Sequence, residues 1–363
     1  MRERLLELLA CPCCGGSFTA RTFSEIEGEI VEGLLTCQCG EAYLIVNAIP
    51  RLLPNAFHEH PEFLQEYGEE IKQHVGSFDK QLVLSSAEVI KTDLDRLQKR
   101  TQKSFGYQWT AFSEMIEEFR GNFLDYTYPI KPSFFKGKVG LDAGCGFGRH
   151  IYYAAEFGAE MVGIDLSAAI DSAYRNTKHL QNVHLVQGDI YKLPFKDKAF
   201  DFVYSIGVLH HLPDPARGFY SLLPLLKPNS SIFIWVYSKK RARINVALES
   251  VRKITCRIPH GFLLPLCFLA ALIDWALFIQ PYKALRTISS VTKTMDRFMF
   301  PRIKLYAKYP FQVCYADWFD RLSAPIRFYY SEEELERWFE KANLRNARIS
   351  PTGNYGWRAY GEN

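Results

Sequence analysis

A chain of 363 residues is too long for one average domain and long enough to bury a sizeable core. Its formal net charge of +4 gives no global case for a nucleic-acid partner. The first residues lack a long apolar region and a cleavage site, so we expect a reducing cytoplasmic setting, where clustered cysteines indicate a metal before a disulfide.

The first segment of the chain is rich in cysteine. We expect a short amphipathic helix at Leu5–Ala10, then a hairpin over Glu25–Leu35. Its phrases read Cys11-Pro12-Cys13-Cys14-Gly15, Cys37-Gln38-Cys39-Gly40 and Asn47-Ala48-Ile49-Pro50-Arg51. They resemble the small zinc-ribbon domain of the tRNA-methyltransferase activator family, and the resemblance implies such a domain over residues 1–54.

The resemblance also implies a structural zinc ion bound by Cys11, Cys14, Cys37 and Cys39. Two cysteine pairs on two turns make a tetrahedral thiolate site, which holds a domain too small for its own core. Because four sulfur ligands leave no open position, a catalytic zinc is not expected. Cys37 and Cys39 have one residue between them where the family has two, so two alternatives stay open. Either Cys13 replaces the fourth ligand, or the ribbon binds no metal.

Residues 55–100 are polar and show helical spacing after Ser85, which predicts a linker with helices. The stretch Lys138–Tyr152 then predicts a strand, a tight turn and a helix. Its apolar run ends on Asp142, and Gly144, Gly146 and Gly148 follow. Glycine is needed there because the turn takes backbone angles that a Cβ forbids, and because a ligand must lie against bare backbone.

Further apolar strands follow in order. Glu160–Ile164 ends on Asp165, about 20 residues after the turn, where a carboxylate can accept hydrogen bonds from both hydroxyls of a ribose. Val183–Val186 and Phe200–Tyr204 come next, and the latter opens the phrase FDFVYSIGVLHHLPDP. A fifth strand is expected at Ile232–Tyr237.

These motifs, in register over about 100 residues, resemble the class I S-adenosylmethionine-dependent methyltransferases. The phrase FDFVYSIGVLHHLPDP is similar to the group that contains the quinone-biosynthesis C-methylases. The resemblance implies an α/β fold with a doubly wound, seven-stranded Rossmann-like methyltransferase sheet. Its core would span residues 101–238 and 309–363, and a helix before the sheet would cap the cofactor pocket, with Tyr107 and Trp109 as candidates to line it.

The resemblance implies a role for each motif in binding S-adenosylmethionine. Asp142 would hold the methionine ammonium directly or through water, and Asp165 would bind the ribose. Asp189 and Ile190 would meet the adenine, and Ser205 and Gly207 would border the transferred methyl group. The full implied set is Asp142, Gly144, Cys145, Gly146, Gly148, Asp165, Leu166, Asp189, Ile190 and Ser205.

Two adjacent histidines are the best candidates for a catalytic base. His210 and His211 follow the carboxyl end of the fourth strand, where doubly wound sheets place their sites, and a histidine titrates near neutral pH. A purely structural role stays open, because this pair is common in the group whatever the substrate. Asp317, Asp320 and Tyr329 are weaker candidates, provided that their segment folds back over the pocket.

Residues 239–308 interrupt the fold and concentrate positive charge. They hold 14 Lys or Arg against three acids, a local balance of +11, which leaves about −7 for the rest. Such asymmetry marks a surface for an anionic partner. The apolar run Phe262–Ile279 within it allows three alternatives: a membrane span, an interfacial lipid-facing lid, or a buried helical hairpin or oligomer interface. Pro265, Asp274 and basic residues on both flanks argue against a span.

The last part of the chain predicts the end of the sheet. Ser331 is expected to cap a helix that runs through Ala342. Asn343–Ile349 and Asn354–Tyr360 would be the final antiparallel pair.

We therefore expect a methyltransferase with a small, apolar or lipid-linked acceptor, cytoplasmic and peripheral at an anionic membrane surface. Nucleic acid is not an expected partner. One alternative is an RNA or protein methyltransferase, although Ser205-Ile206-Gly207-Val208 lacks the Asn-Pro-Pro-Tyr-like motif of base or glutamine N-methylation. The other is a non-catalytic cofactor-binding scaffold, against which the intact Asp142 and Asp165 argue.

Overall fold

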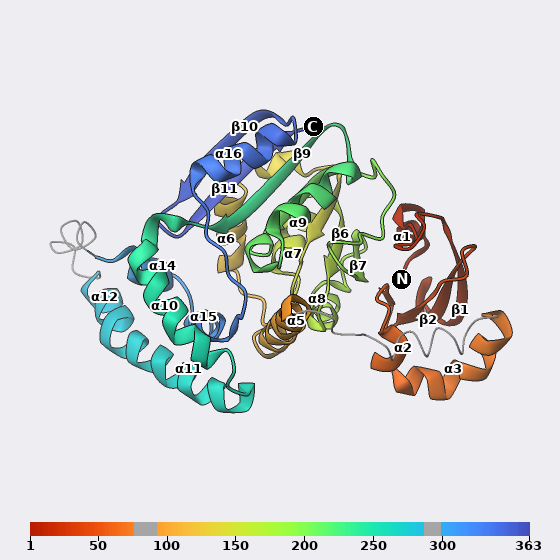
Figure 1. Ribbon diagram of the computed structural model, residues 1–363, viewed down its shortest axis with the longest axis horizontal. Coiled ribbons are helices and arrows are strands. Elements are labelled where there is room, and N and C mark those ends of the chain that lie inside the picture. The colour runs from red at the N-terminus through yellow and green to blue at the C-terminus, as the bar shows by residue number, and fades with distance from the viewer. Residues whose placement is uncertain (76–92, 287–298) are drawn as a thin grey trace.

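The computed structural model describes residues 1–75, 93–286 and 299–363 of the chain (Figure 1). One sheet of 11 strands runs through this described part, in the order β1-β2-β3-β4-β7-β6-β5-β8-β9-β11-β10. The last seven strands in that order are the expected doubly wound methyltransferase sheet, which is thereby confirmed. The other four belong to the cysteine-rich segment, so the ribbon extends the sheet rather than standing apart from it.

Five parallel strands form the middle of the sheet, and an antiparallel pair ends it. The parallel strands are β5 (Val139–Ala143), β6 (Glu160–Asp165), β7 (Val183–Gln187), β8 (Phe200–Ile206) and β9 (Leu226–Tyr237). β11 (Gly356–Glu362) pairs antiparallel with β9 and with β10 (Arg345–Thr352). The last two strands thus begin two residues later than the sequence predicts. In β9, Asn229 adopts φ +61°, the left-handed backbone that asparagine tolerates.

Helices cover both faces of the sheet because alternate strand residues point to opposite sides. Ile232, Ile234 and Val236 of β9 enter one core, whereas Phe233 and Trp235 enter the other. The first core is covered by α9 (Pro215–Leu222) and α16 (Glu332–Lys341), and the second by α6 (Glu118–Tyr126), α7 (Arg149–Glu156) and α8 (Ala169–Thr177). Short 3-10 turns lie at Pro132–Phe134, Leu209–His211 and Leu223–Leu225.

The helix α16 begins as the sequence predicts. The Ser331 hydroxyl accepts a hydrogen bond from the N–H of Glu334, and the Glu334 carboxylate accepts one from the N–H of Ser331, which forms a capping box.

The ribbon consists of α1 (Glu3–Leu8) and the strands β1 (Phe18–Ile26), β2 (Glu29–Cys37), β3 (Ala42–Val46) and β4 (Ile49–Arg51). β4 lies parallel to β7, where Arg51 pairs with Gln187. The buried Arg51 side chain donates to Asp171 Oδ1 at 2.6 Å and to Gln187 Oε1 at 3.1 Å. Removal of one partner of such a buried pair is strongly destabilising. The ribbon and the methyltransferase sheet therefore share one core.

Between the ribbon and β5, the described residues form α2 (Ala56–Glu59), α3 (Pro61–His74) and α5 (Asp93–Ala111), which precede α6. Residues 76–92 of the predicted linker, including Ser85, lie outside the described residues. α5 crosses the boundary predicted at residue 100 and reaches the first βα turn of the sheet.

The described residues of the insertion after β9 are mainly helical. It comprises η4 (Lys239–Arg241), α10 (Ala242–Thr255), α11 (His260–Asp274), the π-helical turn η5 (Trp275–Ile279), α12 (Gln280–Leu285) and α14 (Pro301–Tyr306), and α15 (Phe311–Ser323) follows it. In Figure 1 it lies at the end of the molecule opposite the ribbon. Among the described residues, His260–Leu285 is long and apolar enough to cross a membrane by length and composition alone.

Candidate active site

The turn between β5 and α7 contains the three glycines. Gly144 has φ +90°, and Gly148, at the N-cap of α7, has φ +89°, in the left-handed region that favours glycine. A Cβ on Gly144 would lie 2.4 Å from Cγ2 of Val208, so the turn also depends on close approach of the next loop. A Cβ on Gly146 would make ordinary contact with the Trp109 ring at 3.4 Å.

Alanine at Gly144 is therefore expected to weaken both the fold and cofactor binding. The left-handed backbone and the contact with Val208 together predict a loss of roughly 2–3 kcal/mol in unfolding free energy. Gly144→Ala should also lower the affinity for S-adenosylmethionine in equilibrium dialysis, because the turn must move. Gly121→Ala is the matched control: a Cβ there meets open space in α6, so stability should stay equal or rise. Wild-type affinity and stability in Gly144→Ala would contradict this geometry.

Asp165 ends β6 at the same edge of the sheet. Its Oδ2 accepts from the N–H of Gly146 at 2.9 Å, and its Oδ1 accepts from the N–H and hydroxyl of Ser167 at 2.8 and 2.7 Å. Burial raises the pKa of Asp165, and these hydrogen bonds oppose the rise. The carboxylate lines a cavity, where its remaining lone pairs can accept hydrogen bonds from ribose hydroxyls.

Asp142 lies behind the glycine turn rather than in the wall of the cavity. Its Oδ2 is buried, as is Nε2 of His150, and neither atom has a hydrogen-bond partner among the described residues. Burial raises the pKa of Asp142 to about 8, although the nearby Tyr204 hydroxyl lowers it. A cation or a bridging water would satisfy these atoms, so the position fits contact with an ammonium group through water better than direct contact.

The helix α5 closes the cofactor side of the cavity. Gln102 donates from Nε2 to the carbonyl of Leu166 at 2.9 Å, and Trp109 lies over the glycine turn. Trp109 lines the cavity, as predicted from the sequence. Tyr107 does not. It packs against His260 of the insertion, with ring centroids 4.8 Å apart, because residues two apart on a helix point in different directions.

The cavity has a volume of about 1330 Å³. Small-molecule pockets typically measure about 300–1,000 Å³, so this space has room for a nucleoside cofactor and a second molecule. The predicted site residues that line it are Gly144, Cys145, Gly146, Asp165, Leu166, Asp189, Ile190 and His211. Asp142, Gly148, Ser205 and His210 are outside its lining.

Ser205 differs from the expectation that it borders the transferred methyl group. Its side chain is fully buried and donates to the carbonyl of Ala143 at 2.8 Å, which ties β8 to β5. Strand residues alternate in direction, and it is Ile206 that faces the cavity. Gly207 follows with φ +81° and open space at its Cβ position, so the cavity wall there is bare backbone.

The two histidines have different surroundings. His211 lines the cavity, and its Nδ1 lies 2.7 Å from the carbonyl oxygen of Ile326. Because a carbonyl only accepts, Nδ1 carries the proton, and Nε2 is left as an acceptor in the neutral ring. His210 is fully buried beside the Tyr237 ring, and neither of its ring nitrogens has a partner among the described residues. Of the two predicted base candidates, the structure places only His211 at the cavity.

Burial lowers the pKa of His211 to about 4 from an ordinary value of 6.5. The unfolded chain therefore binds the proton more readily, and the His211 contribution to stability is lost as the pH falls from 6.5 towards 4. The difference corresponds to about 3 kcal/mol. In urea unfolding at several pH values, His211→Gln should remove about this much of the acid destabilisation. Substitution of the exposed His179 by Gln should leave the pH profile unchanged. An identical profile for His211→Gln and wild type would contradict the buried neutral state.

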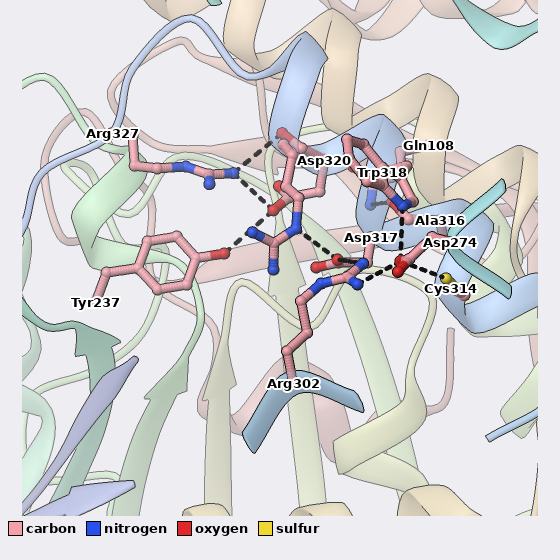
Figure 2. Close-up of polar contacts among 11 residues, drawn as sticks. Gln108, Tyr237, Asp274, Arg302, Cys314, Ala316, Asp317, Trp318, Asp320 and Arg327 are labelled. Atoms are coloured by element: carbon pink, nitrogen blue, oxygen red, sulfur yellow. Dashed lines mark hydrogen bonds and ion pairs between the residues drawn. The ribbon is translucent and has the colours of Figure 1, made fainter. Parts of the chain in front are cut away.

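The end of the cavity away from the glycine turn is built from ion pairs, which Figure 2 shows. Asp320 accepts at Oδ2 from the hydroxyl of Tyr237 at 3.1 Å and from Arg327 at 2.6 Å. Asp317 accepts at Oδ2 from Arg321 at 2.6 Å and from Arg302 at 3.4 Å. All six side chains contribute to the cavity wall.

A second layer of contacts holds this network in place. Arg302 also donates to Asp274 of α11, whose Oδ2 accepts from the indole N–H of Trp318 at 3.1 Å. Burial alone would raise the pKa of Asp317, but the guanidiniums of Arg321 and Arg302 outweigh it and hold that pKa below its usual range. The cavity thus ends in a polar wall that is charged at neutral pH.

The weaker candidates predicted from the sequence, Asp317, Asp320 and Tyr329, all line the cavity. The arginines of the wall, Arg302, Arg321 and Arg327, were not among the predicted residues. The alternation of acids and arginines in an aromatic stretch from 317 to 327 is a signal that could have indicated them.

The four predicted zinc ligands lie together in the ribbon. The Sγ atoms of Cys11, Cys14, Cys37 and Cys39 all lie within 4.8 Å of one another. The Cys11–Cys39 and Cys14–Cys37 sulfur distances are 3.7 and 3.4 Å, close to the roughly 3.8 Å edge of a tetrahedron with Zn–S bonds of about 2.3 Å. Cys13 is exposed and outside the cluster.

These residues fit a structural zinc ion, so the single-residue gap between Cys37 and Cys39 does not require Cys13 as a ligand. Gly16 makes room for the cluster, because a Cβ there would lie 3.2 Å from Cys14 Sγ and 3.3 Å from Cys37 Sγ.

Known protein families match two separate segments of the chain. Residues 141–234 match the family model of the methyltransferase domain, and residues 2–47 match that of Trm112p-like proteins. The ubiquinone biosynthesis O-methyltransferase of Coxiella burnetii is 33% identical over 148 residues, 40% of this chain and 59% of that protein. The tRNA U34 carboxymethyltransferase of Pseudoalteromonas translucida is 37% identical over 103 residues, 27% of this chain and 32% of that protein.

Among solved structures, a chain of a complex that contains the Haloferax volcanii Trm112 methyltransferase activator is 13% identical, with a TM-score of 0.42, and the match covers 72% of this chain and 96% of that chain. The curated relatives above are matched over 32% to 59% of their own length. By the two family models, residues 141–234 of this chain are a methyltransferase domain and residues 2–47 are a Trm112p-like domain.

Proposed function

We propose that this chain transfers a methyl group from S-adenosylmethionine to a small acceptor that is apolar or lipid-linked. The observation that carries the proposal is one continuous cavity of about 1330 Å³, whose lining includes both the glycine turn and the Arg–Asp wall. Its volume and its two chemically different ends match a cofactor and an acceptor held in line.

The cofactor end accounts for the first half of the reaction. Asp165 would accept hydrogen bonds from the ribose, Asp189 and Ile190 would border the adenine, and the bare backbone at Gly144 and Gly146 would pass under the methionine part. S-adenosylmethionine supplies an activated methyl group, so the protein has mainly to align the two reactants and exclude water. Trp109 and the rest of α5 serve the exclusion of water, because they cover the turn.

The acceptor end accounts for the second half. Ile206 and Gly207 line the cavity between its cofactor end and its acceptor end. His211 lines the same part of the cavity, with Nε2 unprotonated in the neutral ring. This nitrogen can accept a hydrogen bond from a hydroxyl or enol of the acceptor and so orient it, and it could take the proton only where the bound acceptor and cofactor raise the pKa of His211 from about 4 towards neutrality. The Tyr237 hydroxyl and the Arg–Asp wall would hold the polar group of the acceptor, while its apolar part would contact the aromatic lining.

The relatives favour two different acceptors, and one experiment separates them. The enzyme is incubated with S-adenosylmethionine labelled in its methyl group and with either a lipid extract or total RNA. Label is expected in the organic phase with the lipid extract, and Asp165→Ala should abolish it. Label found only in RNA, or only in protein, would contradict a lipid acceptor and would support an RNA or protein methyltransferase instead. No transfer despite tight cofactor binding would favour a scaffold.

A further inference from the structure

The continuous helix made of α11, η5 and α12 (the α11–α12 helix) exposes apolar side chains on most of its circumference. One stripe, made of Leu263, Cys267, Ala271 and Asp274, is buried against the body of the protein. The rest of the helix surface is apolar as well, although it faces outward. Its exposed large side chains are Phe262, Leu266, Phe268, Leu269, Leu272, Ile273, Leu277, Phe278 and Leu285.

Exposure of this kind is unusual for a helix in water. Phe262 is 74% exposed, Leu277 64% and Leu269 54%. A soluble helix that packs on one side presents polar residues on the other, so an outward apolar face indicates that something covers it. The face is also continuous, because these residues recur at intervals of three and four along one helix.

Basic side chains stand at both ends of this apolar face. Lys253 and Arg257 precede α11, Lys283 and Arg286 belong to α12 or follow it, and all four are exposed. The two acids of the described insertion are engaged elsewhere: Glu249 pairs with Arg252, and Asp274 is buried with Arg302. The rim of the face is therefore positively charged.

We propose that the α11–α12 face docks on an anionic lipid surface, with its apolar side chains in the interface and its basic ends on the headgroups. An apolar helix with flanking Lys and Arg binds such a surface through burial of its apolar side chains and through attraction of its charges to anionic headgroups. A second copy of the chain fits less well, because either orientation of two such faces brings basic ends against basic ends. A transmembrane orientation does not fit either, since Leu263, Cys267 and Phe319 form a buried contact that attaches α11 along its length to α15.

The helix that carries the docking face contacts the cavity wall through its buried stripe. Tyr306 of α14 packs with Ala271 of that stripe and with Ile279, and it also lines the cavity. Phe300, just before α14, is 72% exposed and lines the cavity as well. The helix of the docking face and the cavity wall are thus neighbours, and the exposed Phe300 would be the first contact for an acceptor that leaves a lipid surface. Docking itself does not depend on methyl transfer, so the two proposals can fail separately.

Vesicle co-sedimentation of the full chain tests the docking. The wild type is expected to bind phosphatidylcholine vesicles that contain about one third phosphatidylglycerol, and binding should weaken with salt. A variant with Leu266→Gln, Leu269→Gln and Ile273→Gln should bind at least about tenfold more weakly. The control Ile26→Gln removes an equally exposed apolar side chain from the ribbon and should bind as wild type.

A second variant separates charge from apolar contact. Lys253→Gln with Lys283→Gln should weaken binding to the anionic vesicles by about fivefold per charge and leave binding to pure phosphatidylcholine unchanged. Thermal unfolding and calorimetry with S-adenosylmethionine verify that each variant is folded. Absence of vesicle binding by the folded wild type would overturn the proposal. So would a dimer in sedimentation velocity that the triple variant dissolves and that excludes vesicles.

Discussion

Replacement of Asp165 by alanine is expected to raise the dissociation constant for S-adenosylmethionine by at least about 100-fold. The carboxylate would lose its charge-assisted hydrogen bonds to the ribose, each worth roughly 1.5–3 kcal/mol. It would also stop accepting from the N–H of Gly146, so the glycine turn would lose an anchor on the cofactor side. Equilibrium dialysis with labelled cofactor measures the change.

Two further variants show whether the effect comes from the Asp165 carboxylate. Asp165→Asn keeps the shape and one accepting oxygen, so its dissociation constant should lie between those of wild type and Asp165→Ala. Asp197→Ala removes an exposed acid and should change nothing. If Asp165→Ala bound the cofactor as wild type does, the carboxylate would not hold the ribose and the cofactor would have to lie elsewhere.

Substitution of Cys11 by serine is expected to abolish zinc binding and to destabilise the whole chain. A thiolate-bound structural zinc contributes about 10–16 kcal/mol to folding in isolated zinc-finger peptides. Here the ribbon also packs on the methyltransferase sheet, so part of the fold survives, and we expect a loss of more than about 3 kcal/mol in unfolding free energy. Elemental analysis gives the zinc content, and chemical unfolding gives the free energy.

Cys13→Ser is the matched control, since Cys13 is exposed in the same turn but outside the cluster. It should retain one zinc ion per chain and the stability of wild type. Zinc loss in Cys13→Ser together with zinc retention in Cys39→Ser would show that Cys13 is the fourth ligand. A wild-type protein purified without chelator that contained no zinc would end the metal assignment.

The sequence was sufficient for the parts of the fold that depend on local patterns. The apolar runs ending on Asp142 and Asp165 predicted β5 and β6, and the spacing of the glycines predicted the turn between them. The cysteine pairs predicted the metal cluster, which the ribbon gathers although Cys37 and Cys39 are unusually close. Each of these signals lies within a few tens of residues, where spacing determines geometry.

Features that depend on distant pairing were not predictable in this way. β4 joins β7 through Arg51 and Gln187, which are 136 residues apart, and nothing local in either segment indicates the partner. The Arg–Asp wall combines Arg302 of α14 with Asp317 of α15 and Asp274 of α11, and the order of such helices follows from packing. The direction of single side chains was also hard to predict, as Ser205 and Tyr107 show. A shift of one residue along a strand, or of two along a helix, turns the side chain to the opposite side.

S-adenosylmethionine is expected to bind in the cavity beside the glycine turn, with its ribose on Asp165. Calorimetric titration of the wild-type chain tests this binding most directly. We predict a saturable heat of binding with one cofactor molecule per chain and a dissociation constant in the micromolar range. A folded, zinc-loaded protein that gave no heat and no saturation with either S-adenosylmethionine or S-adenosylhomocysteine would contradict the account.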